Sequence, residues 1–266
     1  PQRPEGRCHL LHIPLTVRAN TRNMKNMLKT VFSRISKIKI DWKYSIREVI
    51  IVVIGITIAF LLNNWQSARQ NRKEEVAILK SLSKTLLNDI KDIDGNLFQY
   101  ETSLHSAKMI TKAFDNNLPY HDSMIFHFSV QPINTMFWRS DGPYEELKSK
   151  GFDLIRNESL RLDIINLYSV RYRVIDHIEG ELPQFQSVQP LLEYNRKNFK
   201  KSSQENFQDY YAVSIEPINY EDIKIDPEYR FLLENIAHWR STKVHLYKET
   251  KDLINELLDE IKKEIR

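Results

Sequence analysis

VIIVVIGITIAFLLNNWQSA, residues 49–68, is a run of twenty residues without a charged side chain. At about 1.5 Å of rise per residue, a helix of this length spans roughly 30 Å, the thickness of a bilayer's hydrocarbon core. Eleven of the fourteen residues from 49 to 62 are Val, Ile, Leu or Phe, which favour insertion. Asn63 and Asn64 lie at the edge beside Trp65, a typical interfacial residue. The stretch therefore predicts a transmembrane helix.

Two other interpretations of this stretch are weaker. A core helix that is apolar on every side needs apolar partners all round, and no other segment of the chain is similarly apolar. A cleaved signal peptide needs small residues at its cleavage site, whereas Trp65 and Gln66 place bulky side chains there. An uncleaved signal anchor remains compatible with the sequence.

The flanking charges predict an orientation. Six Lys or Arg residues lie in the twenty positions before the stretch and five in the twenty after it, and Arg18, Arg22 and Lys25 add to the first group. By the positive-inside rule we expect a cytoplasmic N-terminus at the inner membrane and a periplasmic C-terminal domain.

The 266 residues carry a net charge of +4, which conceals an asymmetry. Residues 1–68 have a net charge of +8, and residues 69–266 one of −4. Nucleic-acid binding is disfavoured, because it requires a basic face on the folded domain. The single cysteine, Cys8, precedes the apolar stretch, so the domain lacks disulfides and thiolate metal sites. We expect no cofactor.

These observations divide the chain into four parts. Residues 1–23 show no clear period and are expected to be disordered or a non-native extension. Residues 24–48 form a basic amphipathic lead-in on the cytoplasmic side. Residues 49–68 are the predicted transmembrane helix, and 69–266 are long enough for one soluble domain.

The residues after the apolar stretch have a heptad pattern that predicts one long helix to about residue 117, continuous with the transmembrane helix. Gly95 lies opposite the predicted seam, where it does not interrupt the register. The predicted seam positions are Val76, Leu79, Ser83, Leu86, Ile90, Ile93, Leu97, Tyr100, Leu104, Ala107, Thr111 and Phe114.

Later segments predict further helices. A short helix is expected at 123–128, one at 141–150 capped by Asp141, one at 158–179 and one at 184–199. Residues 200–225 are expected to be mostly loop, and a last helix begins at Asp226 and reaches about Ile265. With only four glycines after residue 68, the fold class is all-α: a transmembrane helix followed by a bundle with long first and last helices.

Three stretches resemble an uncharacterised family of single-pass membrane proteins from Gram-negative bacteria, known only as a domain of unknown function. They are REVIIVVIGITIAFLLNNWQSARQNRKEE (47–75), YEELKSKGFDLIRNESLRLDIINLY (144–168), and DPEYRFLLENIAHW with VHLYKETKDLINELLDEI (226–261). The resemblance covers most of the chain from residue 27 onward. It implies the same membrane-anchored helical architecture and no assigned activity.

Two groups of residues are candidate sites. Trp138, Arg139 and Asp141 precede a proline-started helix, where the Arg side chain either stacks on Trp or pairs with Asp. This corner is either a structural lock, the favoured interpretation, or a ligand site. Gly55 and Ala59 form a small-x-x-x-small step that would let two transmembrane helices approach closely.

No metal site or catalytic site is predicted. His238 and His245 are seven residues apart, whereas a helical zinc pair needs four. His121, Asp122 and His127 are interpreted as solvated groups. The cluster Asp176, His177, Glu179 and Glu181 is interpreted as a polar helix end in preference to a cation site.

The long helix and the absence of a catalytic motif favour an interaction or scaffold protein that binds a protein partner or a second copy of itself beside the lipid bilayer. The alternative is an extracytoplasmic ligand-sensing bundle that acts through a membrane partner. An enzyme is disfavoured.

Overall fold

The computed structural model describes residues 27, 29, 42–181, 188–203 and 213–266. Helices make up most of these residues, as the all-α prediction expects. The predicted N-terminal extension and most of the basic lead-in lie outside the described residues. The chain divides into two compact units, Pro1–Trp65 and Gln66–Arg266, which are described separately.

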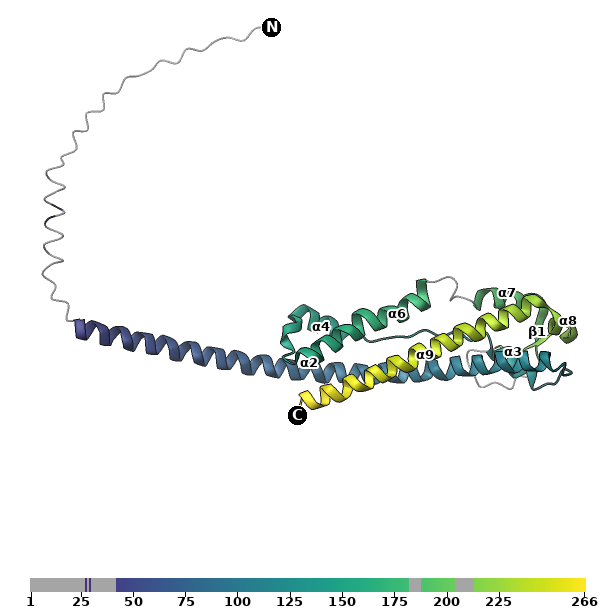
Figure 1. Ribbon diagram of the computed structural model, residues 1–266, viewed down its shortest axis with the longest axis horizontal. Helices are drawn as coiled ribbons and strands as arrows, with labels where there is room; N and C mark the ends of the chain where they lie inside the picture. Colours follow the sequence, from purple (N-terminus) through teal and green to yellow (C-terminus); the bar gives the residue numbers. More distant parts are fainter. Residues whose placement is uncertain (1–26, 28, 30–41, 182–187, 204–212) are drawn as a thin grey trace, which may run out of the picture. The chain divides into compact units, whose positions relative to one another are not determined.

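The first unit contains the start of helix α2, which extends over Trp42–Asp115 (Figure 1). Each residue from 46 to 71 is exposed, including every Val, Ile, Leu and Phe of the apolar stretch. In the described part of the chain, one helix, α2, is long and apolar enough to cross a membrane. Its most apolar 18-residue window has a mean hydropathy of 2.3. Its length and composition are those of a membrane-span candidate.

The second unit is a helical bundle built on an antiparallel pair of long helices. The later part of α2 runs beside α9, Pro227–Glu264 (Figure 1). Ion pairs join the two helices along their length: Arg72 to Glu264 at 3.0 Å, Lys251 to Asp94 at 2.5 Å and Arg230 to Asp115 at 2.7 Å. The side chain of Asp226 caps α9 by accepting from the Glu228 amide at 2.8 Å. The predicted last helix is therefore confirmed.

Shorter helices cover the pair. Helix α4, Gly142–Lys150, ends at Gly151, whose φ of 98° suits a residue without a side chain. The predicted helix over 158–179 is helical but not uniformly α, because two π-helical segments interrupt it. The elements in order are α3 (Met124–Val130), η1 (Phe152–Leu154), α5 (Glu158–Asn166), η2 (Leu167–Arg171), α6 (Tyr172–Asp176), η3 (His177–Glu181) and α7 (Val188–Asn198).

The prediction of mostly loop over residues 200–225 is wrong in part. Strand β1, Phe199–Lys201, pairs antiparallel with β2, Ile215–Pro217. Helix α8, Tyr220–Ile225, follows, and Asn219 caps it by accepting from the Glu221 amide. These segments are too short for a clear period, and they are fixed by packing of Phe199 and Tyr220 into a core with α9.

Two hydrophobic cores lie one after the other along the α2–α9 pair. The first joins early α2 and late α9 to α4, α5, η2 and α6, and it includes Leu79, Leu86 and Ile254. The second joins the end of α2 and the start of α9 to α3, α7, β1 and α8, and it includes Ile110 and Phe128. Each core is completed by a different set of short helices.

The buried seam of α2 differs from the predicted heptad by one position in every seven. Leu79, Leu86, Ile93, Tyr100, Ala107 and Phe114 are buried as predicted. Among the other six predicted seam positions, only Leu97 is buried, and the remaining five side chains are half-buried. The true second series is one residue earlier and mostly polar: Glu75, Leu82, Asp89, Asn96, Ser103 and Ile110. Apolar periodicity could not identify it, because polar side chains occupy it.

Candidate functional site

The predicted corner at Trp138, Arg139 and Asp141 forms around an ion pair. Arg139 Nε donates to the two Asp141 carboxylate oxygens at 2.8 and 3.0 Å, and its Nη1 donates to Asp176 on α6. The guanidinium carbon lies 5.9 Å from the ring centre of Tyr172, whereas Trp138 is 76% exposed. Asp141 is the residue that precedes α4, but its carboxylate binds Arg139 and makes no capping bond.

A buried carboxylate, Asp89 of α2, lies beneath this corner. It accepts from the Tyr172 hydroxyl at 2.8 Å and from the Ser140 amide at 3.1 Å. Burial raises the pKa of Asp89 to about 6, although both donors oppose the shift. Asp89 thus fastens the residues before α4 to the first core.

Asp89 is one of several α2 side chains that bind the backbone of residues 131–141, called the strap. Among the described residues no strand pairs with the strap, so side chains take the place of a sheet partner. Asp92 accepts from the Trp138 amide at 3.0 Å, Asn96 donates to the Met136 carbonyl at 3.1 Å, Tyr100 donates to the Thr135 carbonyl and Ser103 donates to the Gln131 carbonyl at 2.5 Å.

The two cores are separated by a polar layer that contains Arg240 and Lys243 of α9. Arg240 is fully buried and donates to the Ile133 carbonyl at 2.6 Å and to Asn134 Oδ1 at 3.2 Å. Lys243 donates to the Tyr100 hydroxyl at 3.2 Å. Burial, together with the nearby Arg240 charge, lowers the pKa of Lys243 to about 8. The cations therefore hold the strap against α9.

Glu179 closes this network from the third side. Its carboxylate accepts from the Phe137 amide at 2.9 Å and from the Tyr247 hydroxyl at 2.5 Å. Burial, with nearby negative charge, raises the pKa of the Tyr247 hydroxyl, which stays protonated as a donor. The strap is thus bound by α2, α9 and η3. The polar groups of this network form hydrogen bonds with one another.

A polar pocket of about 370 Å³ opens beside the corner, between α4 and η2. Tyr144 and Tyr168 stack in its wall with ring centres 4.4 Å apart, and the Tyr144 hydroxyl lies 3.1 Å from Ser169 Oγ. Its basic and acidic groups include Arg139 and Asp141, which already bind each other. These two groups neutralise each other, and Arg173 is a further cationic side chain of the lining.

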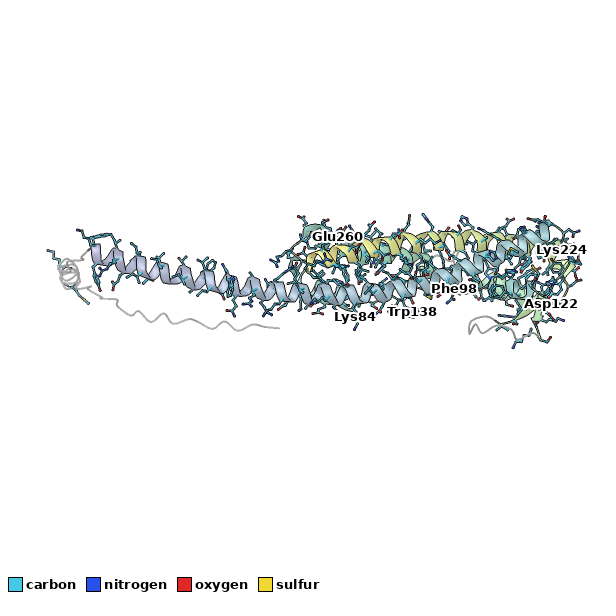
Figure 2. The ribbon with its side chains drawn as sticks, turned by 90° about the horizontal axis from the view of Figure 1, so that it is seen from below. Lys84, Phe98, Asp122, Trp138, Lys224 and Glu260 are labelled. Atoms are coloured by element: carbon cyan, nitrogen blue, oxygen red, sulfur yellow. The ribbon has the colours of Figure 1, made fainter. Side chains whose placement is uncertain are left out.

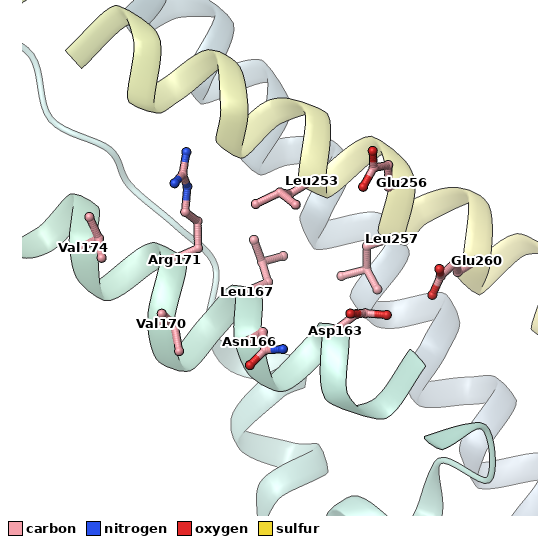
Figure 3. A pocket seen from close by; sticks show the side chains of 10 residues that line it. All are labelled: Asp163, Asn166, Leu167, Val170, Arg171, Val174, Leu253, Glu256, Leu257 and Glu260. Atoms are coloured by element: carbon pink, nitrogen blue, oxygen red, sulfur yellow. The ribbon is translucent and has the colours of Figure 1, made fainter. Parts of the chain in front are cut away.

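A larger groove of about 440 Å³ lies between the α5–η2 segment and α9 (Figure 3). Leu167 and Leu257 face each other from its two walls and are almost fully buried, so they form its floor. Val170 is 57% exposed and Leu253 is 45% exposed along its sides. The groove presents unfilled apolar surface to solvent, and we define these residues with Asp163, Asn166, Arg171, Val174, Glu256 and Glu260 as the α5–α9 groove.

Within the described residues, the basic side chain of the α5–α9 groove is in an ion pair, whereas its acidic side chains on α9 are not. Arg171 is tied to α9 through Glu249 at 2.6 Å and Thr250 at 2.7 Å. No ion pair in the described part of the chain engages Glu256 or Glu260. Figure 3 shows their carboxylates along the α9 side of the groove. The groove therefore combines an apolar floor with an acidic rim.

The remaining sequence candidates are not among the residues that line this groove. Gly55 and Ala59 lie one turn apart in exposed α2, where open space surrounds Gly55 on its outer face. His245 pairs with Glu249 at 3.0 Å, and His238 is exposed. Within the described residues, no group of three or more His, Cys, Asp or Glu side chains is placed to hold a metal ion.

Two carboxylates of the predicted polar helix end, Asp176 and Glu179, bind different parts of the bundle. Asp176 binds Arg139 across the corner, whereas Glu179 binds the strap. His127 lies 3.0 Å from Ser106 Oγ, while His121 bonds to Ser123. Burial lowers the pKa of His127, with His105 adding to the effect. These groups serve local packing.

Sequence reasoning missed the groove and the polar layer. The groove's signal was present as Leu253, Leu257 and Glu256 on one predicted helix, but its second wall depends on how η2 packs. Arg and Lys side chains are usually solvated, but Arg240 and Lys243 continue the spacing of the buried stripe of α9 between Ile236 and Tyr247, and that spacing was the signal for their burial.

Residues 48–220 match the family described as "Family of unknown function (DUF6090)", and the chain belongs to this family. The comparison with curated proteins found no match, and the comparison with solved structures also found none.

Proposed function

We propose that this member of the family is a membrane-anchored helical interaction protein, with one transmembrane helix in the inner membrane of a Gram-negative bacterium and its bundle in the periplasm. The exposed apolar part of α2 carries the proposal. Its best window has a mean hydropathy of 2.3, and none of that window is buried within the structure. In water, such a surface would need a covering, which a bilayer supplies.

The orientation rests on the basic residues that precede the apolar stretch. The bundle after it has a net negative charge, which disfavours binding to anionic lipid headgroups. A protein partner or a second copy is therefore the favoured binding target of the bundle, and Gly55 with Ala59 is a candidate contact for pairing of the transmembrane helices.

A ligand-sensing bundle is the second candidate, because the α5–α9 groove has the volume of small-molecule sites. Its exposed side chains favour an interaction surface instead, since a small-molecule site usually encloses most of its ligand. The strap network also fills the bundle interior with mutually bound polar groups. We therefore assign binding of a macromolecule.

The test uses the full chain in a Gram-negative host. Membranes are washed with alkaline carbonate, and a C-terminal reporter that matures only in the periplasm is assayed. We expect retention in the membrane and an active reporter. Release by carbonate would overturn the anchor, and an inactive reporter on a chain that is retained in the membrane would overturn the orientation.

A photo-crosslinking scan of exposed bundle positions then tests the interaction role. Crosslinkers are placed at Val170, Phe98 and Val213, which are exposed on different parts of the bundle. We expect at least one position to yield a discrete adduct with a protein or a second copy. Absence of an adduct from every position would contradict the interaction role.

A further inference from the structure

The α5–α9 groove has the shape and length of a binding site for a third helix. Its walls are two helical segments, η2 with α5 on one side and α9 on the other (Figure 3). From Asp163 to Val174 the wall extends eleven residues, or roughly 16 Å at helical rise. That length matches about three turns of a docked helix.

The floor and walls of the groove are spaced for apolar side chains of such a helix. Leu167 and Leu257 close the floor, whereas Val170 and Leu253 stay about half exposed above them. An amphipathic helix fills this kind of groove with apolar residues at positions i, i+3 or i+4, and i+7. Burial of the exposed side chains against it would be favourable.

The rim determines the charge of the occupant. Glu256 and Glu260 are one turn apart on α9 and have no cationic partner among the described residues, and Asp163 faces them from α5 with only a Ser159 contact at 3.5 Å. The one cation of the groove, Arg171, is neutralised by Glu249. An anionic occupant would be repelled, and a cationic one attracted.

We propose that the α5–α9 groove binds a cationic amphipathic helix of a partner protein, with apolar residues on the floor and Lys or Arg residues against Glu256 and Glu260. This inference rests on the proposed interaction function and specifies its surface and partner chemistry.

The test measures peptide binding to the full chain in nanodiscs of neutral lipid, with empty nanodiscs subtracted. The probe is a fluorescent fourteen-residue peptide with Leu at helical period and Lys elsewhere. A second probe replaces each Lys with Glu. We expect saturable binding of the Lys probe, weakened by salt, and at least about tenfold weaker binding of the Glu probe.

Two variants locate the binding. Glu256→Lys with Glu260→Lys is expected to weaken the Lys probe about tenfold or more and to favour the Glu probe. Val170→Ser with Leu253→Ser is expected to weaken both probes by removing apolar contact. The matched control, Glu193→Lys with Glu234→Lys, makes the same charge change on exposed carboxylates of α7 and α9 outside the groove.

The outcomes are distinct. Equal effects of groove and control variants would overturn the proposal, as would unchanged binding by both groove variants. Loss of self-association in the groove variants, measured by sedimentation, would replace the partner helix with a second copy. If a crosslinker at Val170 gives no adduct while Phe98 or Val213 does, the groove fails and the interaction function stands. If none of the three gives an adduct, the interaction function fails.

Discussion

Helix α2 contains two regions that depart from the usual rule that apolar side chains are buried and polar ones are exposed. They depart from it in opposite ways. In residues 49–65, apolar side chains are exposed. In the later region, charged and polar side chains such as Glu75, Asp89 and Ser103 are buried (Figure 2 shows the side chains along the whole helix). The composition of the first region is compatible with a lipid environment, whereas in the second region Asp89 and Ser103 are buried against the strap and Glu75 against arginine side chains.

The comparison shows that composition alone does not identify the buried face of a helix. Burying a polar side chain is tolerated only where hydrogen bonds replace those to water. The strap and the arginines supply them: Glu75 accepts from Arg72 at 2.8 Å and from the Arg156 amide at 2.9 Å. Burial acts to raise the pKa of Glu75, but these donors outweigh it and the pKa is lowered.

The largest effect is expected in the exposed apolar region. Val53→Lys with Ile56→Lys should disfavour membrane insertion by about 5 to 7 kcal/mol, because each lysine costs roughly 2.5 to 3.5 kcal/mol near the bilayer centre. Carbonate extraction of membranes measures it. The control is Leu87→Lys with Phe98→Lys, exposed apolar positions of the same helix in the bundle. Equal membrane retention of both variants would contradict a transmembrane role for residues 49–65.

The polar layer should be the most sensitive part of the bundle. Arg240→Ala leaves the Ile133 carbonyl without its donor, removes the shorter of the two bonds to Asn134 Oδ1 and opens a cavity, so we expect a loss of about 3 kcal/mol or more in the free energy of unfolding. Urea unfolding in neutral detergent measures it. Arg230→Ala, which removes a partly exposed ion pair and a hydrogen bond to the Lys224 carbonyl at the start of the same helix, should cost only about 1 kcal/mol. If both variants lose a similar free energy of unfolding, the polar layer contributes no more to stability than a surface ion pair.

The corrected seam can be tested at a single turn of α2. Asn96→Ala removes the bonds to Thr135 and the Met136 carbonyl and should cost about 2 kcal/mol. Asn88→Ala, at an exposed position two turns earlier, should change the free energy of unfolding by less than about 0.5 kcal/mol. If the Asn88 variant proves the more damaging, the assignment of the buried face is wrong.

The smallest effect concerns pH. The folded-state pKa of Asp89, about 6, is above the unfolded value, so the folded state binds more protons between these values. Lowering the pH from 7.5 to 5 should therefore stabilise the parent chain relative to Asp89→Asn by about 1 kcal/mol. Unfolding free energies of the two chains at each pH measure this difference. A constant difference would show that Asp89 has an ordinary pKa.

Much of the architecture could be predicted from local patterns. The breaks at Gly151 and Asp226, and the continuity of α2 through Gly95, follow from caps and heptads. The second half of the α2 seam could not be predicted, because Asp89 and Asn96 are buried only in the presence of the strap. The β1–β2 pair likewise depends on residues distant in sequence.

The candidate corner was partly predictable. Arg139 and Asp141 are close in sequence and pair as one of the two alternatives expects. The roles of Asp176 and Tyr172 were not predictable, because the π-helical segment η2, which precedes both residues, changes the helical phase that would place them. Nor was the α5–α9 groove, whose acidic and apolar residues come from segments about ninety residues apart.

The ion pair between Arg72 and Glu264 places both chain ends of the bundle at the same end of the antiparallel α2–α9 pair. A mechanical force applied between these ends would therefore separate the two helices progressively, breaking the Arg72–Glu264 contact first and the Arg230–Asp115 contact last. Such unzipping loads a few contacts at a time, whereas shear would load all of them together. The bundle should accordingly yield at low force when pulled from its two ends, and resist more strongly when pulled from Arg72 and Arg230.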